Sequence, residues 1–261
     1  MNDKKVSPES IGCPEALRLI LRGAKITDRS CSREAVVYFV DKDEGYFLKS
    51  ASKGALSREA EMTRFFYGKG LSAEVVGYFS DERDWMLTRK IAGRDCTDET
   101  HLSEPELLCE ALANNLLMLH STDAAGCPVP DHTSRYLASA KHRMENGLYE
   151  TEHFPDNWGY ANAGEAWGVV ETRGRLLETD TLLHGDYCLP NVILDGWRFG
   201  GFVDVGCGGV GDRHVDLFWA LWSLSFNLKT DRYNDRFIEA YGRGRIDFEK
   251  LRTVAAVEVF S

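Results

Sequence analysis

Two aspartates and one asparagine occur with a spacing that suits metal-assisted phosphoryl transfer. Asp186 is followed five residues later by Asn191, and Asp204 comes thirteen residues after Asn191. In this chemistry one carboxylate aligns the attacking hydroxyl, while an amide oxygen and a second carboxylate hold the Mg²⁺ that bridges the nucleotide phosphates. The pattern therefore predicts Asp186 as the catalytic residue and Asn191 and Asp204 as the metal ligands.

The segments around these residues predict a loop followed by a β-hairpin. HGDYCLPN at 184–191 parallels the H-R-D…N run of a protein-kinase catalytic loop, and DVG at 204–206 parallels D-F-G. Apolar runs on both sides of an Asp-Gly turn signal predict the hairpin, which would bring Asn191 and Asp204 to the same end. An H-x-D triplet alone is also typical of a structural turn, so the interpretation depends on the combination.

A lysine and a glutamate upstream have the placement of a nucleotide-binding pair. Lys49 ends a predicted strand, and Glu59 lies ten residues later on a predicted helix. A kinase fold needs such a lysine on the nucleotide phosphates, held by a carboxylate from a helix. Both residue types are also common on surfaces, and the neighbours Arg58 and Glu61 complicate the choice of partner.

The remaining pattern divides the chain into a strand-rich and a helical part. Period-two runs and one helical run predict strands at 34–40, 46–49, 75–79 and 85–88 and a helix at 56–67. Beyond Gly93 the pattern is helical, including a capping box at Ser103 and Glu106. We expect helices at 107–120, 135–146, 215–228, 232–241 and 247–260.

These elements indicate an α+β fold of the protein-kinase-like, bilobal type. We expect a small mixed, β-rich N-lobe at residues 1–90 that binds nucleotide. Residues 91–261 would form a larger, mostly helical C-lobe that carries catalysis and acceptor binding.

Composition narrows the class of protein. The chain has 261 residues, a net charge of −10 and seven cysteines without C-x-x-C spacing. An acidic chain is a poor candidate for nucleic-acid binding and slightly favours a cationic small molecule. The sequence holds no apolar run long enough to span a membrane and begins without an apolar signal segment, so we expect a cytoplasmic protein with reduced thiols, monomeric or homodimeric.

Two further motifs have simpler explanations than catalysis or dinucleotide binding. GCGGVG at 206–211 fits G-x-G-x-x-G, but no parallel βαβ pattern surrounds it, so we expect a flexible segment after Asp204. Cys188 lies two residues from Asp186, and the metal-binding context favours a bystander thiol over a nucleophile. His184 is expected to be structural, below the loop.

With these residues in hand, the chain resembles the aminoglycoside 3′-phosphotransferases, antibiotic kinases with a protein-kinase-like fold. Segments 184–191, 202–206 and 212–216 carry the resemblance, which covers nearly the full length. It implies ATP or GTP with Mg²⁺ as cofactors. It also implies that Ser32 lies in the loop over the phosphates, and that the backbone from Arg89 to Ile91 binds adenine.

The same resemblance implies an acceptor site made from acidic residues. Asp156 occupies the acidic position of a helical insert, and Glu258 and Phe260 match a terminal Glu-x-Phe whose carboxylates meet the ammonium groups of the drug. Several positions depart from the family pattern: Cys207 replaces an expected arginine, Ser261 follows the usual last Phe, and Phe226, Asn227 and Gly159 replace acidic contacts.

The function expected from this resemblance is nucleotide-dependent phosphorylation of the 3′-hydroxyl of kanamycin- or neomycin-class aminoglycosides, giving drug resistance. One alternative is a kinase of another small alcohol, such as a macrolide or a choline-like amine. Another is a catalytically impaired nucleotide-binding homologue, motivated by Cys207. The drug spectrum, the choice between ATP and GTP and the oligomeric state stay open at this point.

Overall fold

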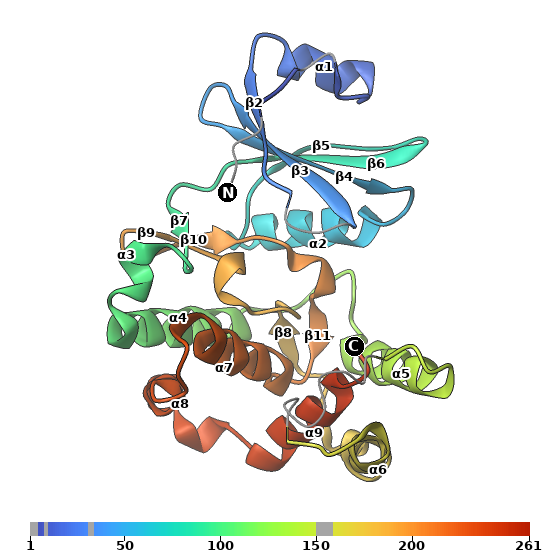
Figure 1. Ribbon diagram of the computed structural model, residues 1–261, viewed down its shortest axis with the longest axis vertical. Coiled ribbons are helices and arrows are strands. Elements are labelled where there is room, and N and C mark those ends of the chain that lie inside the picture. Colours follow the sequence, from blue (N-terminus) through green and yellow to red (C-terminus); the bar gives the residue numbers. More distant parts are fainter. Residues whose placement is uncertain (1–4, 8–9, 31–33, 150–158) are drawn as a thin grey trace. The chain divides into compact units, whose positions relative to one another are not determined.

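The structure is a computed structural model that describes residues 5–7, 10–30, 34–149 and 159–261. Its chain divides into two units (Figure 1). Unit 1 consists of residues 1–93 and 200–206, and unit 2 of residues 94–199 and 207–261. The first unit therefore also includes the short segment that carries Asp204. Nucleotide binding by one part and catalysis by the other stay predictions.

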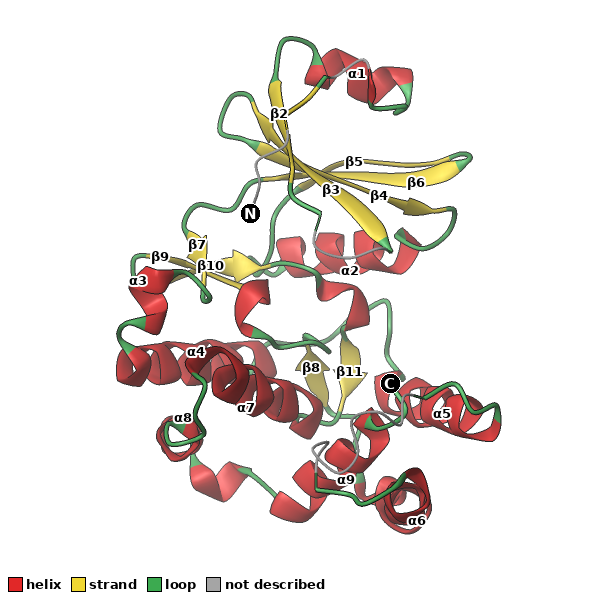
Figure 2. Cartoon of the chain, viewed as in Figure 1, coloured by secondary structure: helices red, strands yellow, loops and turns green. Residues whose placement is uncertain are grey.

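Unit 1 is built on a six-stranded antiparallel sheet with the order β1-β2-β3-β4-β6-β5 (Figure 2). Its strands are β1 (Lys5–Val6), β2 (Lys25–Asp28), β3 (Ala35–Asp41), β4 (Tyr46–Ser52), β5 (Val75–Ser80) and β6 (Arg83–Arg89), and its helices are α1 (Glu15–Leu21) and α2 (Ser57–Gly68). The strands and helix expected between residues 34 and 88 are confirmed. The first three elements, β1, α1 and β2, were not predicted.

Side-chain alternation along β4 decides which helix covers which face of this sheet. Tyr46 and Leu48 belong to the apolar cluster that includes Leu17 of α1. Ala51 belongs to a second cluster, with residues of α2. Because successive side chains of a strand point to opposite faces, Lys49 shares the face of Ala51 and therefore points towards α2.

Unit 2 is mostly helical. Its helices are α3 (Glu99–Leu102), α4 (Pro105–His120), α5 (His132–Glu145), α6 (Ala163–Arg173), α7 (His214–Leu228), α8 (Asn234–Tyr241) and α9 (Phe248–Glu258). Helix α4 packs against α7 and α8, and α9 packs against α5, α6 and α7 (Figure 1). One apolar cluster of this unit is formed mainly by α6, α7, α9 and residues 259–260, and α4 contributes further fully buried residues such as Leu108, Leu112 and Leu116.

Short strands frame the predicted catalytic loop. They are β7 (Arg94–Asp95), β8 (Thr181–Leu183), β9 (Val192–Asp195), β10 (Arg198–Phe202) and β11 (Gly209–Gly211), and the sheets have the orders β10-β9-β7 and β11-β8. The hairpin expected around the Asp-Gly turn is confirmed, since β9 ends at Asp195 and Gly196 has a φ of +54°.

Two local predictions are wrong. The glycine-rich run 206–211 is not a flexible segment, because β11 pairs with β8 through Gly209, Val210 and Gly211. The capping box before α4 does not form: Glu104 is the N-cap residue, and the Ser103 hydroxyl donates to the carbonyl of Thr100. The one-turn helix α3 ends at this point, and Ser103 is its C-cap residue.

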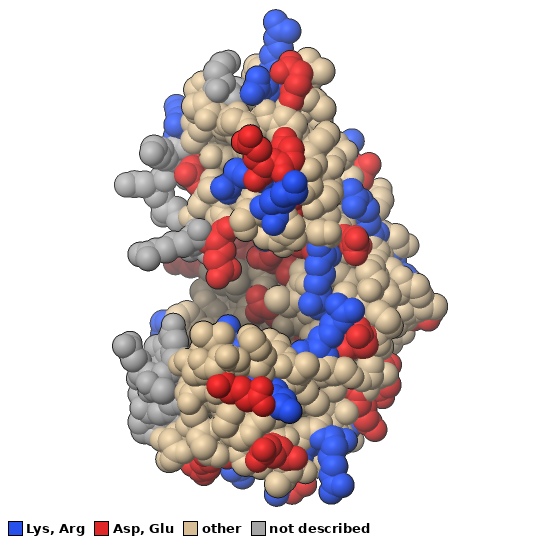
Figure 3. Space-filling model, turned by 90° about the vertical axis from the view of Figure 1, so that its right-hand side faces the viewer, with Lys and Arg blue, Asp and Glu red and all other residues tan. Residues whose placement is uncertain are grey.

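None of the helices in the described part of the chain is long and apolar enough to cross a membrane. On the face drawn in Figure 3, basic and acidic side chains of the described residues are interspersed. The cytoplasmic location stays a prediction.

Candidate active site

Asp186 and Asn191 are joined within the loop between β8 and β9. The Asn191 amide nitrogen donates to the backbone oxygen of Asp186 at 3.0 Å and to its carboxylate Oδ2 at 2.9 Å. The short 3₁₀ helix η3 (Leu189–Asn191) brings the asparagine back to the aspartate. The loop therefore holds the predicted catalytic carboxylate and one predicted metal ligand side by side, with Asp186 half-buried.

A buried carboxylate from α7 anchors this loop. Asp216 is fully buried, and its two oxygens accept the backbone N–H groups of His184 and Gly185, each at 2.8 Å. His120 Nε2 lies 3.1 Å from the same carboxylate, and Tyr241 bonds the other nitrogen of that ring. Burial works to raise the pKa of Asp216, but the hydrogen bonds from His120 and His184 outweigh it and lower the pKa.

Asp216 was not singled out as a site residue in the sequence. The available signal was a carboxylate inside the strongly apolar run 215–228, because a buried charge needs partners and those partners are often functional. His184 is fully buried, in agreement with its expected structural position.

The geometry of the loop explains why glycine stands where a protein kinase has the arginine of H-R-D. Gly185 has a φ of +83°, and a Cβ atom there would collide with the carbonyl of Cys207. Any larger residue would have to move the segment that leads into β11. Cys188 is buried, and burial raises the pKa of its thiol, which disfavours the nucleophilic thiolate.

In unit 1, Lys49 bridges two carboxylates. Its ammonium nitrogen lies 2.8 Å from Glu59 Oε2 and 2.6 Å from Asp204 Oδ1. Burial favours the neutral form of Lys49, yet the negative charges of Glu59 and Asp204 outweigh burial and raise its pKa. Burial also raises the pKa of Glu59 against the opposing effect of Lys49. The structure therefore brings together the lysine and its predicted helix partner, and selects Glu59 over Glu61.

The residues before and after Asp204 are closely packed within unit 1. Before it, the Phe202 N–H donates to Leu71 at 2.7 Å, and the Ser72 hydroxyl donates to Phe202 at 2.8 Å. After it, a Cβ on Gly206 would lie 3.1 Å from the Cβ of Glu59, so a larger residue would require Glu59 to shift by a few tenths of an ångström. Asp204 itself has a φ of +60°, which non-glycine residues rarely adopt. Such strain is typical of functional positions.

The donor atoms at the predicted metal ligands suit Mg²⁺. The Asn191 nitrogen is committed to Asp186, which leaves the amide oxygen as the atom for a cation. Asp204 supplies a carboxylate whose side chain is 53% exposed. Mg²⁺ is commonly held by one or two protein oxygens together with substrate phosphates. No cluster of three or more His, Cys, Asp or Glu side chains suited to a metal occurs among the described residues.

The expected adenine segment is already partly hydrogen-bonded. The Arg89 N–H donates to the Glu74 carbonyl at 3.0 Å, and the Lys90 N–H donates to Gly45 at 3.0 Å. A nucleotide base would therefore have to use the backbone from Ile91 onwards or the carbonyl groups. Two other predicted residues, Ser32 and Asp156, lie outside the described residues.

Glu258 is the last residue of α9, and its carboxylate is buried. The Tyr136 hydroxyl donates to Glu258 Oε1 at 2.7 Å, and Trp219 Nε1 donates to the same atom at 3.2 Å. Burial raises the pKa of Glu258 despite these donors, and the charge of Asp186 raises it further. The final helix is shorter than predicted and starts with Asp247 as its side-chain cap.

Phe260 and Ser261 close the chain inside unit 2. Phe260 is fully buried, with Tyr149 and Trp167 in edge-to-face contact at 5.2 and 5.5 Å. The Ser261 oxygen accepts from Arg143 at 3.0 Å. The Phe260 side chain is therefore a packing residue in this conformation, and the chain end already has a cationic partner.

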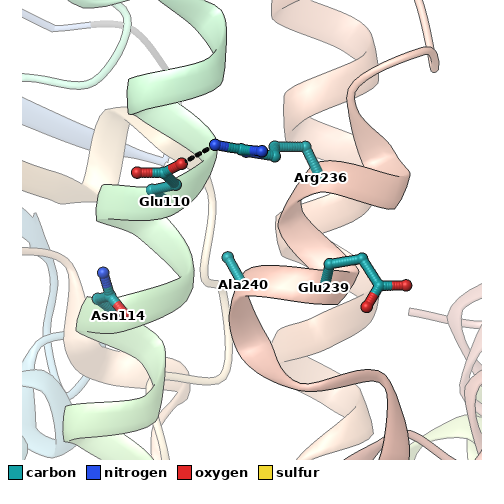
Figure 4. A pocket seen from close by; sticks show the side chains of 5 residues that line it. All are labelled: Glu110, Asn114, Arg236, Glu239 and Ala240. Carbon is teal, nitrogen blue, oxygen red and sulfur yellow. Dashed lines mark hydrogen bonds and ion pairs between the residues drawn. The ribbon is translucent and has the colours of Figure 1, made fainter.

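A pocket elsewhere in unit 2 contains none of the predicted site residues. It lies between α4 and α8, with Glu110 and Arg236 paired across it (Figure 4). Its other lining residues are Asn114, Glu239 and Ala240. None of these lining residues belongs to the loop at 184–191, so this hollow is separate from the proposed catalytic residues.

Comparison with known proteins gives one consistent result. Residues 29–254 match the model of the phosphotransferase enzyme family. A probable aminoglycoside 3′-phosphotransferase from Lactococcus lactis is 48% identical over 248 residues, covering 95% of this chain and 94% of the relative. An aminoglycoside 3′-phosphotransferase from Niallia circulans is 30% identical over 86% of this chain and 87% of the relative.

A solved structure extends the likeness to the fold. The crystal structure of an aminoglycoside 3′-phosphotransferase of type VIII superposes with a TM-score of 0.77 at 26% identity, covering 94% of this chain and 97% of that one. The expected α+β, protein-kinase-like fold class is confirmed, with a sheet in the N-terminal part and helices in the C-terminal part.

Proposed function

This chain belongs to the phosphotransferase enzyme family, and from that premise we propose that it transfers the γ-phosphoryl group of ATP or GTP to the 3′-hydroxyl of kanamycin- or neomycin-class aminoglycosides. The enzyme is a small-molecule O-phosphotransferase. Resistance to the modified drugs would follow in a cell that produces it.

The pairing of Asn191 with Asp186 is the observation that carries this proposal. The Asn191 amide nitrogen donates to both the backbone oxygen and the carboxylate of Asp186. The proposed base and one proposed metal ligand therefore lie in the same loop with a fixed relative orientation. In our proposal Asp186 aligns the sugar hydroxyl and accepts its proton as the phosphoryl group is transferred. Such positioning supplies most of the catalysis in phosphoryl transfer, because the protein forms no covalent bond.

Lys49, Glu59 and Asp204 are proposed to serve the nucleotide. Glu59 holds the Lys49 ammonium in place for the phosphate oxygens, and Asp204 with Asn191 would hold Mg²⁺. When bound, the cation neutralises charge that develops on the phosphoryl oxygens. Since Lys49 now pairs with Asp204, nucleotide and metal binding would exchange that ion pair for phosphate and metal contacts.

The acceptor is proposed to meet the carboxylate of Glu258. Its buried position, its raised pKa and the nearby charge of Asp186 make an ammonium group a favourable partner, since a cation would offset the cost of burying the charge. Asp156 and Phe260 are retained as proposed acceptor residues, and Ser32, Arg89 and Ile91 as proposed nucleotide residues, on the family resemblance alone.

The proposal is tested by nucleotide turnover of the purified enzyme with Mg²⁺ and a panel of acceptors. The panel pairs aminoglycosides that carry a 3′-hydroxyl with close analogues that lack it, and adds a macrolide and choline. We expect turnover only with the 3′-hydroxyl compounds, and a phosphate at that position in the product by ³¹P NMR. Turnover with the analogues would refute the regiochemistry, and turnover with choline or the macrolide alone would refute the substrate class.

A further inference from the structure

Asp84 is a fully buried carboxylate in the sheet of unit 1, and it is not among the residues proposed for catalysis or binding. It lies on the inner strand β6, opposite Ala51 of β4 and Ser80 of β5. Opposite residues of paired strands point to the same face of a sheet, so Asp84 shares the face of Ala51, which packs against α2. Met86, two residues along β6, lies opposite Lys49 on this face. Asp84 and Lys49 therefore both face α2.

The carboxylate of Asp84 holds the chain where α2 begins. Its Oδ2 accepts the backbone N–H of Leu56 at 2.9 Å, and the backbone of the preceding turn also donates to it from Gly54. Leu56 is the N-cap residue of α2, and its apolar side chain makes no capping hydrogen bond. The start of the helix is thus anchored by a carboxylate from a different strand, at the end of the helix dipole that favours an anion.

This anchor also decides what Glu59 can bond. Glu59 lies three residues after the N-cap residue, the position from which a glutamate commonly reaches back to the N-cap N–H. In this helix Asp84 already accepts that N–H. Both carboxylate oxygens of Glu59 are instead directed to the Lys49 ammonium, at 3.0 and 2.8 Å. Asp84 therefore occupies the local donor that would compete with Lys49 for Glu59.

Asp84 is a fixed anion. Burial works to raise its pKa, but hydrogen bonds outweigh burial and lower it, and their donors are the Ser80 hydroxyl, the backbone of Gly54 and Leu56, and the Tyr78 hydroxyl. The Ser80 hydroxyl lies 2.6 Å from Oδ1, and the Tyr78 hydroxyl lies 3.0 Å from Oδ2. These contacts come from β5 and from the turn before α2, so they join the sheet to the helix.

We propose that Asp84 is a positioning residue for the nucleotide site: by accepting the Leu56 N–H it fixes the first turn of α2 and keeps Glu59 on Lys49. The inference rests on the proposed role of Lys49 at the nucleotide phosphates. Without the Asp84 carboxylate, the buried Leu56 N–H loses its acceptor, which is costly, and Glu59 is placed to replace it. Lys49 then loses the carboxylate that holds its ammonium group in place.

The test measures the affinity of Asp84→Ala for ATP with Mg²⁺ by calorimetric titration, without an acceptor. We expect the Kd to rise by about tenfold or more, because a small displacement of a binding group is costly in a preorganised site. The ATP KM should rise in the same way, while the aminoglycoside KM stays at the wild-type value. Asp84→Asn should restore wild-type affinity, since its amide oxygen can still accept the Leu56 N–H and the hydroxyls can turn to accept from its nitrogen.

Ser80→Ala is the matched control. It removes a hydrogen bond from the same carboxylate but leaves the contact with Leu56 in place. This variant should lower the urea unfolding midpoint without changing the Kd for ATP. If Asp84→Ala does not fold, Asp84→Ser replaces it with the same expected rise, because the serine hydroxyl ends one bond short of the carboxylate oxygens.

A double-mutant cycle with Glu59→Ala tests whether Asp84 acts through Glu59. When the Glu59 carboxylate is already absent, removal of Asp84 should change the Kd for ATP by no more than about twofold. Independent, multiplying effects would show that Asp84 acts on the nucleotide by another route and would overturn the inference. A loss of stability with an unchanged Kd in the single variant would make Asp84 a purely structural residue, which also overturns it.

The titration separates this inference from the proposed function. A wild type that binds ATP but phosphorylates no aminoglycoside refutes the proposed function, and the Kd values of the variants still decide the role of Asp84. A wild type that binds no nucleotide refutes both.

Discussion

Two buried carboxylates in unit 2, Asp216 and Glu258, differ in what surrounds them. Asp216 accepts two backbone N–H groups and lies beside His120, and its pKa is lowered although burial opposes this. Glu258 accepts from a tyrosine and an indole on one oxygen and has Ser261 as a further donor, yet burial raises its pKa. Both residues are almost inaccessible to solvent, so the difference comes from the donors and charges around each carboxylate.

This difference separates a structural anchor from a binding group. The charge of Asp216 is satisfied within the protein, and its partners are the backbone of the catalytic loop. Glu258 has only neutral donors, from Tyr136, Trp219 and Ser261, and they do not fully offset the cost of burying its charge. A buried carboxylate whose pKa stays raised despite its donors gains most from a cationic ligand, which is the role proposed for Glu258.

The largest expected effect on activity comes from substitution of a third carboxylate, Asp186, with which the effects at Asp216 and Glu258 can be compared. Asp186→Asn should lower kcat by roughly 10²–10⁴-fold or more, because proton acceptance and alignment of the hydroxyl are both impaired. Its urea unfolding midpoint should match the wild type, since Asp186 is only half-buried. Asp231→Asn, an exposed change before α8, is the control. Near-wild-type turnover in Asp186→Asn would remove this residue from the mechanism.

Asp216→Ala should impair both stability and activity, which would distinguish an anchor from a catalytic group. It leaves two buried N–H groups and His120 without their acceptor, and breaking a buried charge pair typically costs about 3–5 kcal/mol. Urea unfolding gives the stability, and turnover below the transition gives kcat. Asp216→Asn keeps one acceptor oxygen and should lie between the alanine variant and the wild type. A stable Asp216→Ala protein with normal kcat would contradict the interpretation that Asp216 anchors the catalytic loop.

The contrast between the two regions also explains what the sequence could predict. Asp186, Asn191 and the hairpin could be predicted because their contacts are local. Turn signals and strand alternation depend on residues that are neighbours in the sequence. Lys49 and Glu59 could be predicted because the hydrophobic periodicity placed them on a strand and on the following helix. The anchor Asp216 was missed because its partners lie 31 and 32 residues away, in a loop that sequence spacing does not connect to α7.

The acceptor region was predicted less completely, for the same physical reason. The resemblance gave Glu258 only an ammonium group of the drug as its partner, and a negative charge is unfavourable at the C-terminal end of a helix. The structure supplies Tyr136 and Trp219, which come from α5 and α7 and are 122 and 39 residues away. Likewise, the burial of Phe260 depends on α6 and the chain end, and α6 was not predicted at all.

Glu258→Gln should affect acceptor binding while leaving the fold intact. We expect the aminoglycoside KM to rise by about tenfold, since a charge-assisted hydrogen bond contributes roughly 1.5–3 kcal/mol. The ATP KM should hardly change. Glu249→Gln, an exposed change on the same helix, is the control. If Glu258→Gln left the drug kinetics unchanged, Glu258 would be a structural residue like Asp216. The proposed difference between an anchoring and a ligand-binding carboxylate would then be wrong.

The smallest effect is a difference in how stability depends on pH. Because the folded pKa of Glu258 is raised above its unfolded value, the folded state binds the proton more tightly. The stability associated with this group is therefore fully present below the unfolded pKa and is lost as pH rises through the folded pKa. Asp216 has a lowered pKa, so its contribution is present above the unfolded value and is lost as pH falls through the folded one.

Urea unfolding of the wild type and of Glu258→Gln between pH 5 and 8 measures how the titration of Glu258 changes the free energy of unfolding. The variant lacks the titrating group, so its stability relative to the wild type should increase with pH. Saturating aminoglycoside should stabilise the wild type more than the variant at the upper end of the range, because the ammonium group of the drug then partners the charged carboxylate. A relative stability that is constant with pH, or that decreases, would mean that Glu258 is as well satisfied as Asp216, and its raised pKa could no longer support a cationic ligand.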